Sequence, residues 1–426
     1  MVAIKKLYTD PNIGQFNGKY VEIVSDCSYI IHNSNATDAF SSLYINSTNQ
    51  HVSYLTTSGL IYKSSSSLYP TTTADWNISY TIDANATSTN GANINLTGDS
   101  NKLYLSYYDN LNATLKYAYS NSLSPTDVNA WTITTVGNSL TNIGKFNSLA
   151  INSTTPYISF YDETNKDLKL AYSTKLNPTS TEWTILSPDP YQDRGKYSNI
   201  VVNTERIYIS YGDTDTNNLR FTFSNNLLPE NENDWYRYIL RFSPQASLYT
   251  SLVYHNDNIY ISYYDPLSMD LKIIYSKKKE PNRIEDWVDI SVDTPGDVGE
   301  YTSLAITQNR LFITYHDSTE NNFNIAYSND LYPTISDNWK LLTVDNPTGI
   351  NAGKYSSLHT VDYNPSTDKG VIYATYNYGD SIKHISLDAL NKNKVAKNNT
   401  LTNINTASTY PPYNNFTSCL IARLKD

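Results

Sequence analysis

The six tryptophans of the chain form a ladder with a nearly constant interval. Successive members are 55, 52, 52, 52 and 52 residues apart. The ladder consists of Trp76, Trp131, Trp183, Trp235, Trp287 and Trp339. Such a fixed period indicates a repeat fold, in which one supersecondary unit recurs and each copy buries its apolar face against the next. The chain is therefore constrained to a ring or an array of such units.

Each unit contains four short runs that are typical of β-strands. In residues 301–345 they read YTSLAI, LFITYHD, FNIAYSND and WKLLTVD, with polar turns between them. Tyr, Ile, Thr and Val favour strands, whereas Asn, Asp, Ser and Pro favour turns. A neighbouring unit reads YTSLVY, IYISYYD, LKIIYSK and WVDISVD. We expect every unit to form a four-stranded antiparallel sheet.

The number of repeats follows from how often the first run of the unit recurs. An apolar residue recurs in it at Leu43, Leu96, Leu149, Ile200, Leu252, Leu304 and Leu358. An eighth first run, NNFTSCLIA, ends the chain with Cys419 at this position. The N-terminal segments AIKKLYTD, KYVEIVSD and CSYIIHN resemble the three runs missing from that unit, and they put Cys27 at the tryptophan position.

These counts predict an all-β fold, a single eight-bladed β-propeller over residues 1–426, closed by pairing of N- and C-terminal strands in one blade. The expected blades are approximately residues 41–90, 91–143, 144–194, 195–246, 247–298, 299–352, 353–411, and 412–426 together with 1–40. A seven-bladed ring with an irregular terminal sheet is the alternative. In the eight-bladed register two strands separate Cys27 from Cys419, so we expect free thiols roughly 14 Å apart.

The turn before the fourth run resembles that of Asp-box (BNR-type) propeller repeats, in which Ser-x-Asp-x-Gly-x-x-Trp joins the third and fourth strands. Here it reads SNDLYPTISDNW at 328–339 and SNNLLPENENDW at 224–235. The Ser, the strand context and the Trp match, whereas the Gly is missing and a Leu-x-Pro element is inserted. The SYYD…LKxAYS core is similar to repeats of large exported bacterial propeller proteins. The resemblance implies a propeller, and it implies little about activity.

The second run ends in an aspartate in five units. The pairs at this position are Tyr108-Asp109, Tyr161-Asp162, Gly212-Asp213, Tyr264-Asp265 and His316-Asp317. In a propeller the connections after strands 2 and 4 share one face, which usually holds the ligand by fold-level analogy. One interpretation is that each Asp caps a constant hairpin while the aromatic residue packs between blades. The other is a repeated glycan site, with a sugar ring on the aromatic face and its hydroxyls bonded to Asp.

Calcium is a further use for two of these loops. DETNKD at 162–167 and DTDTNN at 213–218 are rich in oxygen ligands, which suit a hard cation. Neither loop has EF-hand spacing, and the equivalent loops at 265–270 and 317–322 are less acidic. We therefore predict no cofactor and keep calcium as the alternative.

Charge and hydropathy exclude several classes of partner. The net charge of −10, with no Lys/Arg stripe, argues against a nucleic-acid surface. No apolar stretch approaches the roughly 18 residues of a membrane helix, and the N-terminus has no h-region of a signal peptide. We expect a soluble protein without membrane insertion, consistent with a cytoplasmic or virion-associated location.

The near-equality of the units argues against an enzyme, because catalysis needs one asymmetric constellation. Sialidases, which the Asp-box resemblance brings into view, bind a carboxylate through three Arg residues and use a Tyr nucleophile. No motif in this chain marks three convergent Arg. We therefore predict a non-enzymatic recognition or assembly scaffold, with lectin-like binding of glycans or a protein surface at repeated blade edges. A structural virion or surface-layer component and a glycan-cleaving sialidase-like enzyme are the alternatives.

Overall fold

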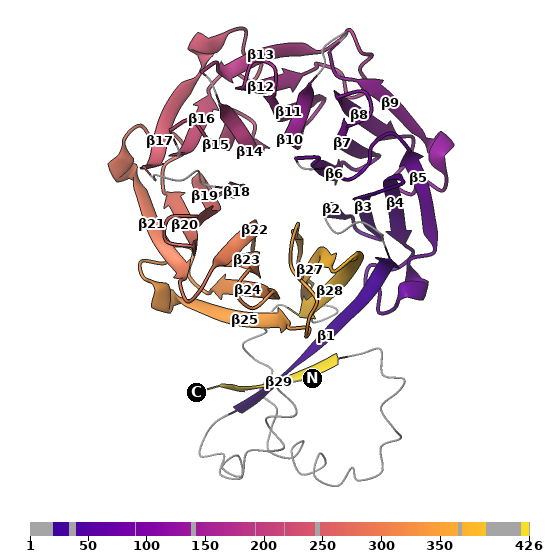
Figure 1. Cartoon of the computed structure of the whole chain (residues 1–426), viewed down its shortest axis with the longest axis vertical. Helices are drawn as coiled ribbons and strands as arrows, with labels where there is room; N and C mark the ends of the chain where they lie inside the picture. The colour runs from indigo at the N-terminus through magenta and orange to yellow at the C-terminus, as the bar shows by residue number, and fades with distance from the viewer. Residues whose placement is uncertain are drawn as a thin grey trace.

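The chain folds as a β-propeller with seven blades around a central channel (Figure 1). The computed structural model describes residues 20–33, 40–89, 91–137, 142–191, 193–216, 218–242, 248–364, 369–388 and 419–425. Each blade is an antiparallel sheet whose first strand lies at the channel and whose fourth strand lies at the rim. The predicted class, an all-β propeller of four-stranded blades, is confirmed. The predicted number of eight blades is wrong.

The strands of the first six blades follow one another along the chain. Blades 1 to 3 consist of β2 (Ser41–Ile45), β3 (Gln50–Thr56), β4 (Gly59–Ser65) and β5 (Ile78–Asp83); β6 (Ile94–Gly98), β7 (Leu103–Asp109), β8 (Thr114–Ser120) and β9 (Trp131–Thr135); and β10 (Ile143–Asn152), β11 (Thr155–Asp162), β12 (Asp167–Tyr172) and β13 (Thr184–Asp189). Blades 4 to 6 consist of β14 (Arg194–Val202), β15 (Ile207–Asp213), β16 (Asn218–Ser224) and β17 (Tyr236–Phe242); β18 (Leu248–His255), β19 (Asn258–Asp265), β20 (Asp270–Ser276) and β21 (Trp287–Asp293); and β22 (Val298–Thr307), β23 (Arg310–Asp317), β24 (Asn322–Ser328) and β25 (Trp339–Asp345).

Short 3₁₀ helices precede the fourth strand in five blades. They are η1 (Thr73–Asp75), η2 (Val128–Ala130), η3 (Glu232–Asp234), η4 (Ile284–Asp286) and η5 (Ser336–Asn338). Each ends directly before a tryptophan of the ladder, so the Leu-x-Pro turn delivers the indole to the rim. None of the helices in the described part of the chain has the length and apolarity required to cross a membrane.

The seventh blade takes its fourth strand from the N-terminus, and this explains the error in the blade count. Its strands are β26 (Ser357–Asn364), β27 (Lys369–Tyr378), β28 (Ser381–Asp388) and β1 (Tyr20–Asn33). Residues 26–33 of β1 pair antiparallel with β28. CSYIIHN is therefore a fourth strand, as predicted, but it belongs to blade 7. KYVEIVSD runs into it without a turn, since no Gly, Pro or Asn separates them. AIKKLYTD lies outside the described residues.

The last strand, β29 (Cys419–Lys425), does not begin a blade. It pairs antiparallel with residues 20–26 of β1, beyond the part of β1 that contacts β28 (Figure 1). Asp26 lies opposite Cys419 in this pairing, so the predicted separation of Cys27 and Cys419 by two intervening strands is wrong. The expectation of two free thiols stays a prediction.

The tryptophan ladder seals the seams between blades. The indole of Trp131 stands edge-on to Tyr62 of the preceding blade at 5.5 Å between ring centroids, and its Nε1 donates to the Tyr80 hydroxyl at 2.9 Å. Trp76 donates in the same way to Tyr29 of β1, also at 2.9 Å. This equivalent contact identifies β1 as the outer strand of the blade that precedes blade 1. Trp recurs because a large flat ring fills each seam.

A second seam contact links a strand-2 tyrosine to an aspartate that ends strand 4 of the preceding blade. The pairs are Tyr107 with Asp83 at 2.9 Å, Tyr211 with Asp189 at 2.7 Å, Tyr315 with Asp293 at 2.6 Å and Tyr376 with Asp345 at 2.8 Å. After blade 2 the aspartate position holds Val136, and the tyrosine position holds Phe160. The two residues of the pair have thus changed together, which leaves no buried polar group without a partner.

Candidate binding site in the central channel

The strongest candidate site is the central channel, which is lined by the beginning of the first strand of every blade. Its cavity has a volume of about 210 Å³. Apart from Gly91, the lining residues recur with the repeat, one to three positions before the apolar residue used to count the units. They are aromatic, Ser, Thr, Asn, Gly or Ile, and none of them carries a charge. The channel is therefore a neutral site with both apolar and hydrogen-bonding surface.

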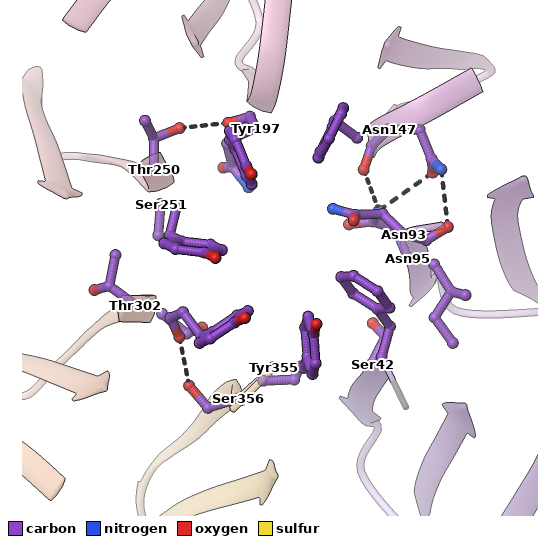
Figure 2. Close-up of a pocket in the computed structure, with 18 of the residues that line it drawn as sticks. Ser42, Asn93, Asn95, Asn147, Tyr197, Thr250, Ser251, Thr302, Tyr355 and Ser356 are labelled. Carbon is purple, nitrogen blue, oxygen red and sulfur yellow. Dashed lines mark hydrogen bonds between the residues drawn. The ribbon is translucent and has the colours of Figure 1, made fainter. Parts of the chain in front are cut away.

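Six aromatic residues surround most of this channel, and we call them the aromatic collar. The collar consists of Phe40, Phe146, Tyr197, Tyr249, Tyr301 and Tyr355. Neighbouring rings touch, with centroid distances between 3.9 Å for Phe40 and Tyr355 and 4.9 Å for Tyr197 and Tyr249. Figure 2 shows Tyr197 and Tyr355 at the edge of the opening. Five of the six side chains are only partly buried, so ring surface remains open to the channel.

The backbone turns these side chains by an uncommon conformation. All collar residues except Phe40 have φ between 52° and 60°, the left-handed region. Bulky residues rarely adopt it, at a cost of roughly 1–3 kcal/mol each. In four blades the ladder between strands 1 and 2 changes register at this point, for example between Lys145 and Ser148. A β-bulge of this kind re-aims a side chain. Recurrence of the strained residue in five blades points to a role for the ring itself.

Two circles of hydrogen bonds hold the collar in place. In the first circle a backbone N–H of strand 1 donates to a side-chain oxygen of the preceding blade, as from Leu96 to Ser42 at 2.9 Å and from Leu43 to Ser357 at 3.0 Å. In the second, a hydroxyl donates to a collar carbonyl of the preceding blade, as from Thr250 to Tyr197 at 2.8 Å. These bonds cross the seams beside the channel, so they fix neighbouring collar residues relative to each other.

Blade 2 interrupts the collar. It has Asn93 at the aromatic position and Ile94 where the other blades have Ser, Thr or Asn. In every blade except blade 1, a strand-2 hydroxyl bonds to the polar residue at this position in the next blade, as Ser159 does to Ser198 at 2.9 Å. Ser53, which faces blade 2, has no such partner and is buried. Blade 2 is therefore the blade in which the aromatic residue of the described collar is replaced.

Two phenols of the collar are uncharged at neutral pH. Burial, with the neighbouring Tyr301 and Glu300, raises the pKa of Tyr197 to about 12. Burial and the phenols of Tyr301 and Tyr197 also raise the pKa of Tyr249. Both phenols therefore stay protonated donors at neutral pH. Lys196, which directly precedes a collar residue, is paired with Asp193 at 3.0 Å, so its charge is compensated.

The predicted aspartates lie in the turns after strand 2, each in its own blade. All five accept backbone N–H groups of their own hairpin: Asp109 from Asn112, Asp162 from Thr164 and Asn165, Asp213 from Asp215 and Thr216, Asp265 from Leu267, and Asp317 from Glu320. They are between 0% and 9% exposed. This geometry is that of hairpin caps. The proposal that they contact a glycan stays a prediction.

The aromatic partners of these aspartates stand behind the collar. Tyr108, Tyr161, Tyr264 and His316 are at most 5% exposed. The hydroxyl of Tyr161 donates to Asp193 at 2.8 Å, and that of Tyr264 donates to Asp297 at 2.7 Å. Tyr161 lies 6.3 Å from Phe146 of the collar, measured between ring centroids. The structure thus brings them close to the channel and covers most of their surface with neighbouring blades.

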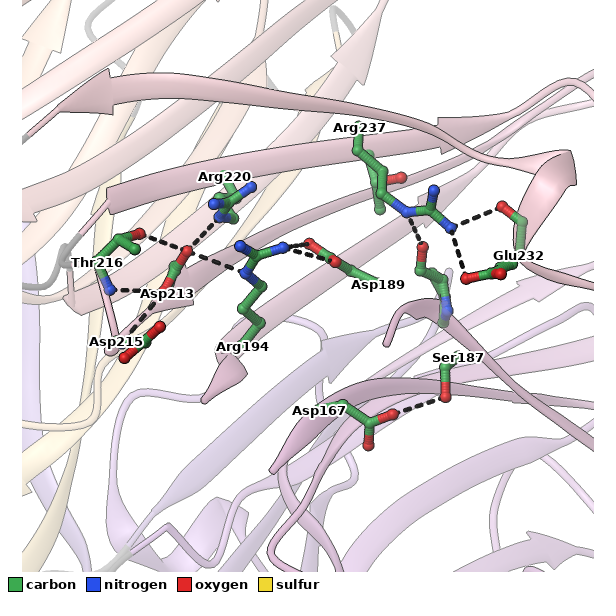
Figure 3. Close-up of polar contacts among 12 residues, drawn as sticks. Asp167, Ser187, Asp189, Arg194, Asp213, Asp215, Thr216, Arg220, Glu232 and Arg237 are labelled. Carbon is green, nitrogen blue, oxygen red and sulfur yellow. Dashed lines mark hydrogen bonds and ion pairs between the residues drawn. The ribbon is translucent and has the colours of Figure 1, made fainter. Parts of the chain in front are cut away.

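Blade 4 differs from the others by a buried charged cluster at its turn (Figure 3). Asp213 accepts from Arg194 Nε at 3.1 Å and from Arg220, and Arg194 also bonds to Asp189 at 2.9 Å. Burial alone would raise the pKa of Asp213, but hydrogen bonds from Thr216 and Arg220 outweigh it and lower the pKa. Two guanidinium groups on this carboxylate oppose a bound cation in the loop proposed for calcium. In the described ranges no three His, Cys, Asp or Glu side chains are grouped to hold a metal ion.

Sequence reasoning missed the aromatic collar, although the chain carries a signal for it. A Gly-x-aromatic sequence opens the first run in four units, as in GKF at 144–146 and GEY at 299–301. The Gly is needed because its φ is positive and a Cβ would approach strand 3 of the preceding blade: a Cβ on Gly195 would lie only 2.7 Å from the Cα of Leu168. In the sequence the aromatic residue of this motif looks like any other strand residue, since the bulge that turns it into the channel has no obvious signature.

Comparison with known proteins places the fold. No family model matches the sequence, and no curated protein matches it. The WD40 domain of coronin from Toxoplasma gondii aligns over 89% of this chain and 89% of that chain, with 9% identity and a TM-score of 0.52. The core factor of S. cerevisiae aligns over 92% of this chain and 65% of that chain, with 9% identity and a TM-score of 0.52. The SapL1 lectin, solved with alpha methyl fucoside, aligns over 74% of this chain and 99% of that chain, with 13% identity and a TM-score of 0.47. At such identities the likeness shows the fold alone.

Proposed function

We propose that this propeller is a non-enzymatic recognition module that binds a neutral glycan at the aromatic collar. The observation that carries the proposal is the ring of six touching aromatic residues, five of them in a strained backbone conformation, around an uncharged channel. Strain of this kind persists where the surrounding structure holds a functional geometry in place. In this chain the two circles of hydrogen bonds hold the collar residues in that conformation.

A sugar matches the two kinds of surface in the channel. The C–H face of a pyranose packs on an aromatic ring, and its hydroxyls need neutral donors and acceptors. The collar supplies the rings and the phenols, and Ser, Thr and Asn side chains line the remainder. A charged ligand would lose its hydration in this channel without meeting an opposite charge, which is costly. This argument favours neutral sugars over phosphates and sialic acids.

The same lining supports recognition rather than cleavage. Glycosidases generally place two carboxyl groups about 5–10 Å apart on either side of the scissile bond. Among the described residues that line the channel there is no Asp, Glu or Arg. Arg194 and Arg220, which a sialidase-like enzyme would need to direct at its substrate, are instead directed at Asp213.

Loss of one collar ring tests the proposal. We expect methyl glycosides of glucose, galactose, mannose or N-acetylglucosamine to bind weakly, and Tyr249→Leu to lower the affinity about five- to tenfold, because one stacked ring is worth about 1 kcal/mol. A saturation-transfer NMR titration measures the affinity of the parent and of the variant for each methyl glycoside. Leu keeps an unbranched β-carbon at the left-handed position, so the fold should persist, and a thermal melt checks this.

Tyr236→Leu is the matched control. Tyr236 lies on β17 at the rim and is 51% exposed, so its loss should leave binding unchanged. If no neutral glycoside binds, or if both variants bind as the parent does, the collar is not a glycan site. Binding of choline with no glycoside bound would also overturn the proposal, because an aromatic ring can take a quaternary ammonium ion by cation–π attraction.

A further inference from the structure

The interruption of the collar at blade 2 is a cluster of three asparagines. Asn93 and Asn95 lie on β6 and its approach, and Asn147 lies on β10 of the next blade. We call this cluster the amide notch. Figure 2 shows its three members together at the edge of the opening. All three line the channel cavity. The other blades place an aromatic residue where Asn93 stands, so the notch gives the channel one polar side.

Asn147 makes the notch rigid, because its own amide is fully used. Its Nδ2 donates to the carbonyls of Asn93 at 2.9 Å and Gly144 at 3.0 Å. Its Oδ1 accepts from Ser106 at 2.7 Å and from Asn95 Nδ2 at 3.4 Å. Asn147 is 1% exposed. A side chain with every hydrogen-bonding position engaged holds one orientation, so it is a fixed support for its neighbours.

Asn95 is oriented by this support. Its Nδ2 donates to the backbone carbonyl of Asn147 at 2.7 Å. Only the nitrogen of the amide can donate to a carbonyl, so Oδ1 lies on the other branch of the side chain. Within the described residues Oδ1 of Asn95 and the side-chain amide of Asn93 make no hydrogen bond to the protein. The notch therefore presents a positioned acceptor beside a group that both donates and accepts.

Gly91, two residues before Asn93, lets the ring of Phe146 approach the backbone beside the notch. Gly91 has φ of 78°, and a Cβ at this position would lie 3.0 Å from Cζ of Phe146. The ring of Phe146 thus packs over Gly91, where a side chain would otherwise stand. The collar comes close to the notch from that side without covering it.

We propose that the amide notch is the specificity-determining part of the channel site and reads the hydroxyls of a single sugar residue, one per propeller. The inference rests on the proposed function and names the part of the ligand that is recognised. The apolar face of the sugar packs on the collar, and one hydroxyl donates to Oδ1 of Asn95 while another bonds to the amide of Asn93. The cavity of about 210 Å³ is below the roughly 300–1,000 Å³ of sites for larger ligands, which favours one ring.

Asn95→Ser tests this inference without removing the support of the fold. Six blades hold the first circle with Ser or Asn at this position, as Ser42 and Ser251 do. A serine at 95 is therefore compatible with the seam, and it lacks the amide. The matched control is Asn199→Ser, at the same repeat position in blade 4, where the side chain bonds the N–H of Leu252 and lies among collar tyrosines.

The measurement is the affinity of each protein for the best-binding methyl glycoside and for its monodeoxy analogues. In the parent we expect one analogue to bind at least tenfold more weakly, because it leaves a buried acceptor unpaired. In Asn95→Ser this penalty should shrink to about twofold, and in Asn199→Ser it should stay as in the parent. Asn93→Ser should change the penalty for a second hydroxyl.

The outcomes separate the two proposals. If the parent binds no neutral glycoside, the proposed function and this inference both fail. If the parent binds and Tyr249→Leu weakens binding, but Asn95→Ser and Asn93→Ser discriminate among the analogues as the parent does, the notch does not determine specificity and the proposed function stands. A folded Asn199→Ser that loses discrimination to the same extent would also overturn the inference.

Discussion

At the scale of single residues, the aspartates after strand 2 are expected to differ in their contribution to stability. Asp213→Ala should be the most damaging, with a loss of about 3–5 kcal/mol, because it leaves Arg194 and Arg220 without their shared carboxylate. Asp162→Ala removes an acceptor of two backbone N–H groups and should cost about 1–3 kcal/mol. Asp215 is exposed, so Asp215→Ala serves as the control. It should change the free energy of unfolding by no more than about 0.5 kcal/mol. Urea unfolding measures all three.

The same variants decide between the two interpretations of the aromatic–Asp pairs. A cap affects the free energy of unfolding and leaves ligand affinity unchanged as long as the protein is folded. If the double variant Asp162→Ala and Asp265→Ala folds as the parent does and loses binding to an immobilised glycan, these residues are ligand contacts at the blade edge. Equal stability of Asp213→Ala and Asp215→Ala would contradict the capping geometry.

Residue roles followed from sequence only where they depend on local turn chemistry. An Asp at the end of a strand predicts a cap because its side chain reaches an N–H group two or three residues ahead, and the repeat shows this five times. The role of Tyr249 or Tyr301 depends on a bulge and on contact with the next blade. Those are tertiary properties, and in sequence each tyrosine is one more strand residue among 39 in the chain.

At the scale of elements, the seam between strands 2 and 4 contains an internal control. At the seam between blades 2 and 3 the chain has Val136 and Phe160, where four other seams have an Asp and a Tyr. We expect Val136→Asp alone to destabilise by several kcal/mol, since it buries a carboxylate without its partner. Phe160→Tyr alone should cost about 1–3 kcal/mol. The double variant should be about 2 kcal/mol more stable than the sum of the two single losses predicts.

Urea unfolding of the four proteins in this cycle gives the coupling free energy. The reverse cycle at an existing seam, with Tyr315→Phe and Asp293→Val, should give a coupling of the same sign. Additive losses in both cycles would mean that the hydroxyl–carboxylate bond contributes nothing specific to the seam.

Strand positions were predictable because two signals agree along the chain. Runs of Tyr, Ile and Val recur with the period of the tryptophan ladder, so a single ambiguous run is resolved by its counterparts. The predicted number of blades was wrong because both termini contain strand-like segments, and sequence alone does not say which strand each segment pairs with. Tyr29 of β1 meets Trp76, and only the structure shows that contact.

At the scale of the whole molecule, the two termini should differ in importance. Deletion of residues 1–33 removes the outer strand of blade 7, including Ile31, which is 1% exposed. It leaves β28 as an open edge, so we expect insolubility or a severe loss of melting temperature. Deletion of residues 419–426 leaves four strands in each of the seven blades, and the melting temperature should change little. Differential scanning calorimetry compares the two.

A chain with β1 moved to another position tests whether the deletion of residues 1–33 acts through the loss of this strand. Residues 20–33 placed after residue 388 through a short linker should restore folding, because the strand then meets β28 from the other end of the chain. If the C-terminal deletion is as damaging as the N-terminal one, or if the rearranged chain stays unfolded, β1 is not the closing strand.

Closure by β1 also sets a delay during synthesis. This strand leaves the ribosome before the other described strands, and its partner β28 is made about 350 residues later. At about 5–20 residues per second the wait is roughly 20–70 s. Throughout that time β1 has two unpaired edges, which are open to pairing with the same strand of another nascent chain. The yield of folded protein in a cell should therefore depend on how many chains are being made side by side on one messenger, and on whether a chaperone covers the first thirty residues until the ring can close.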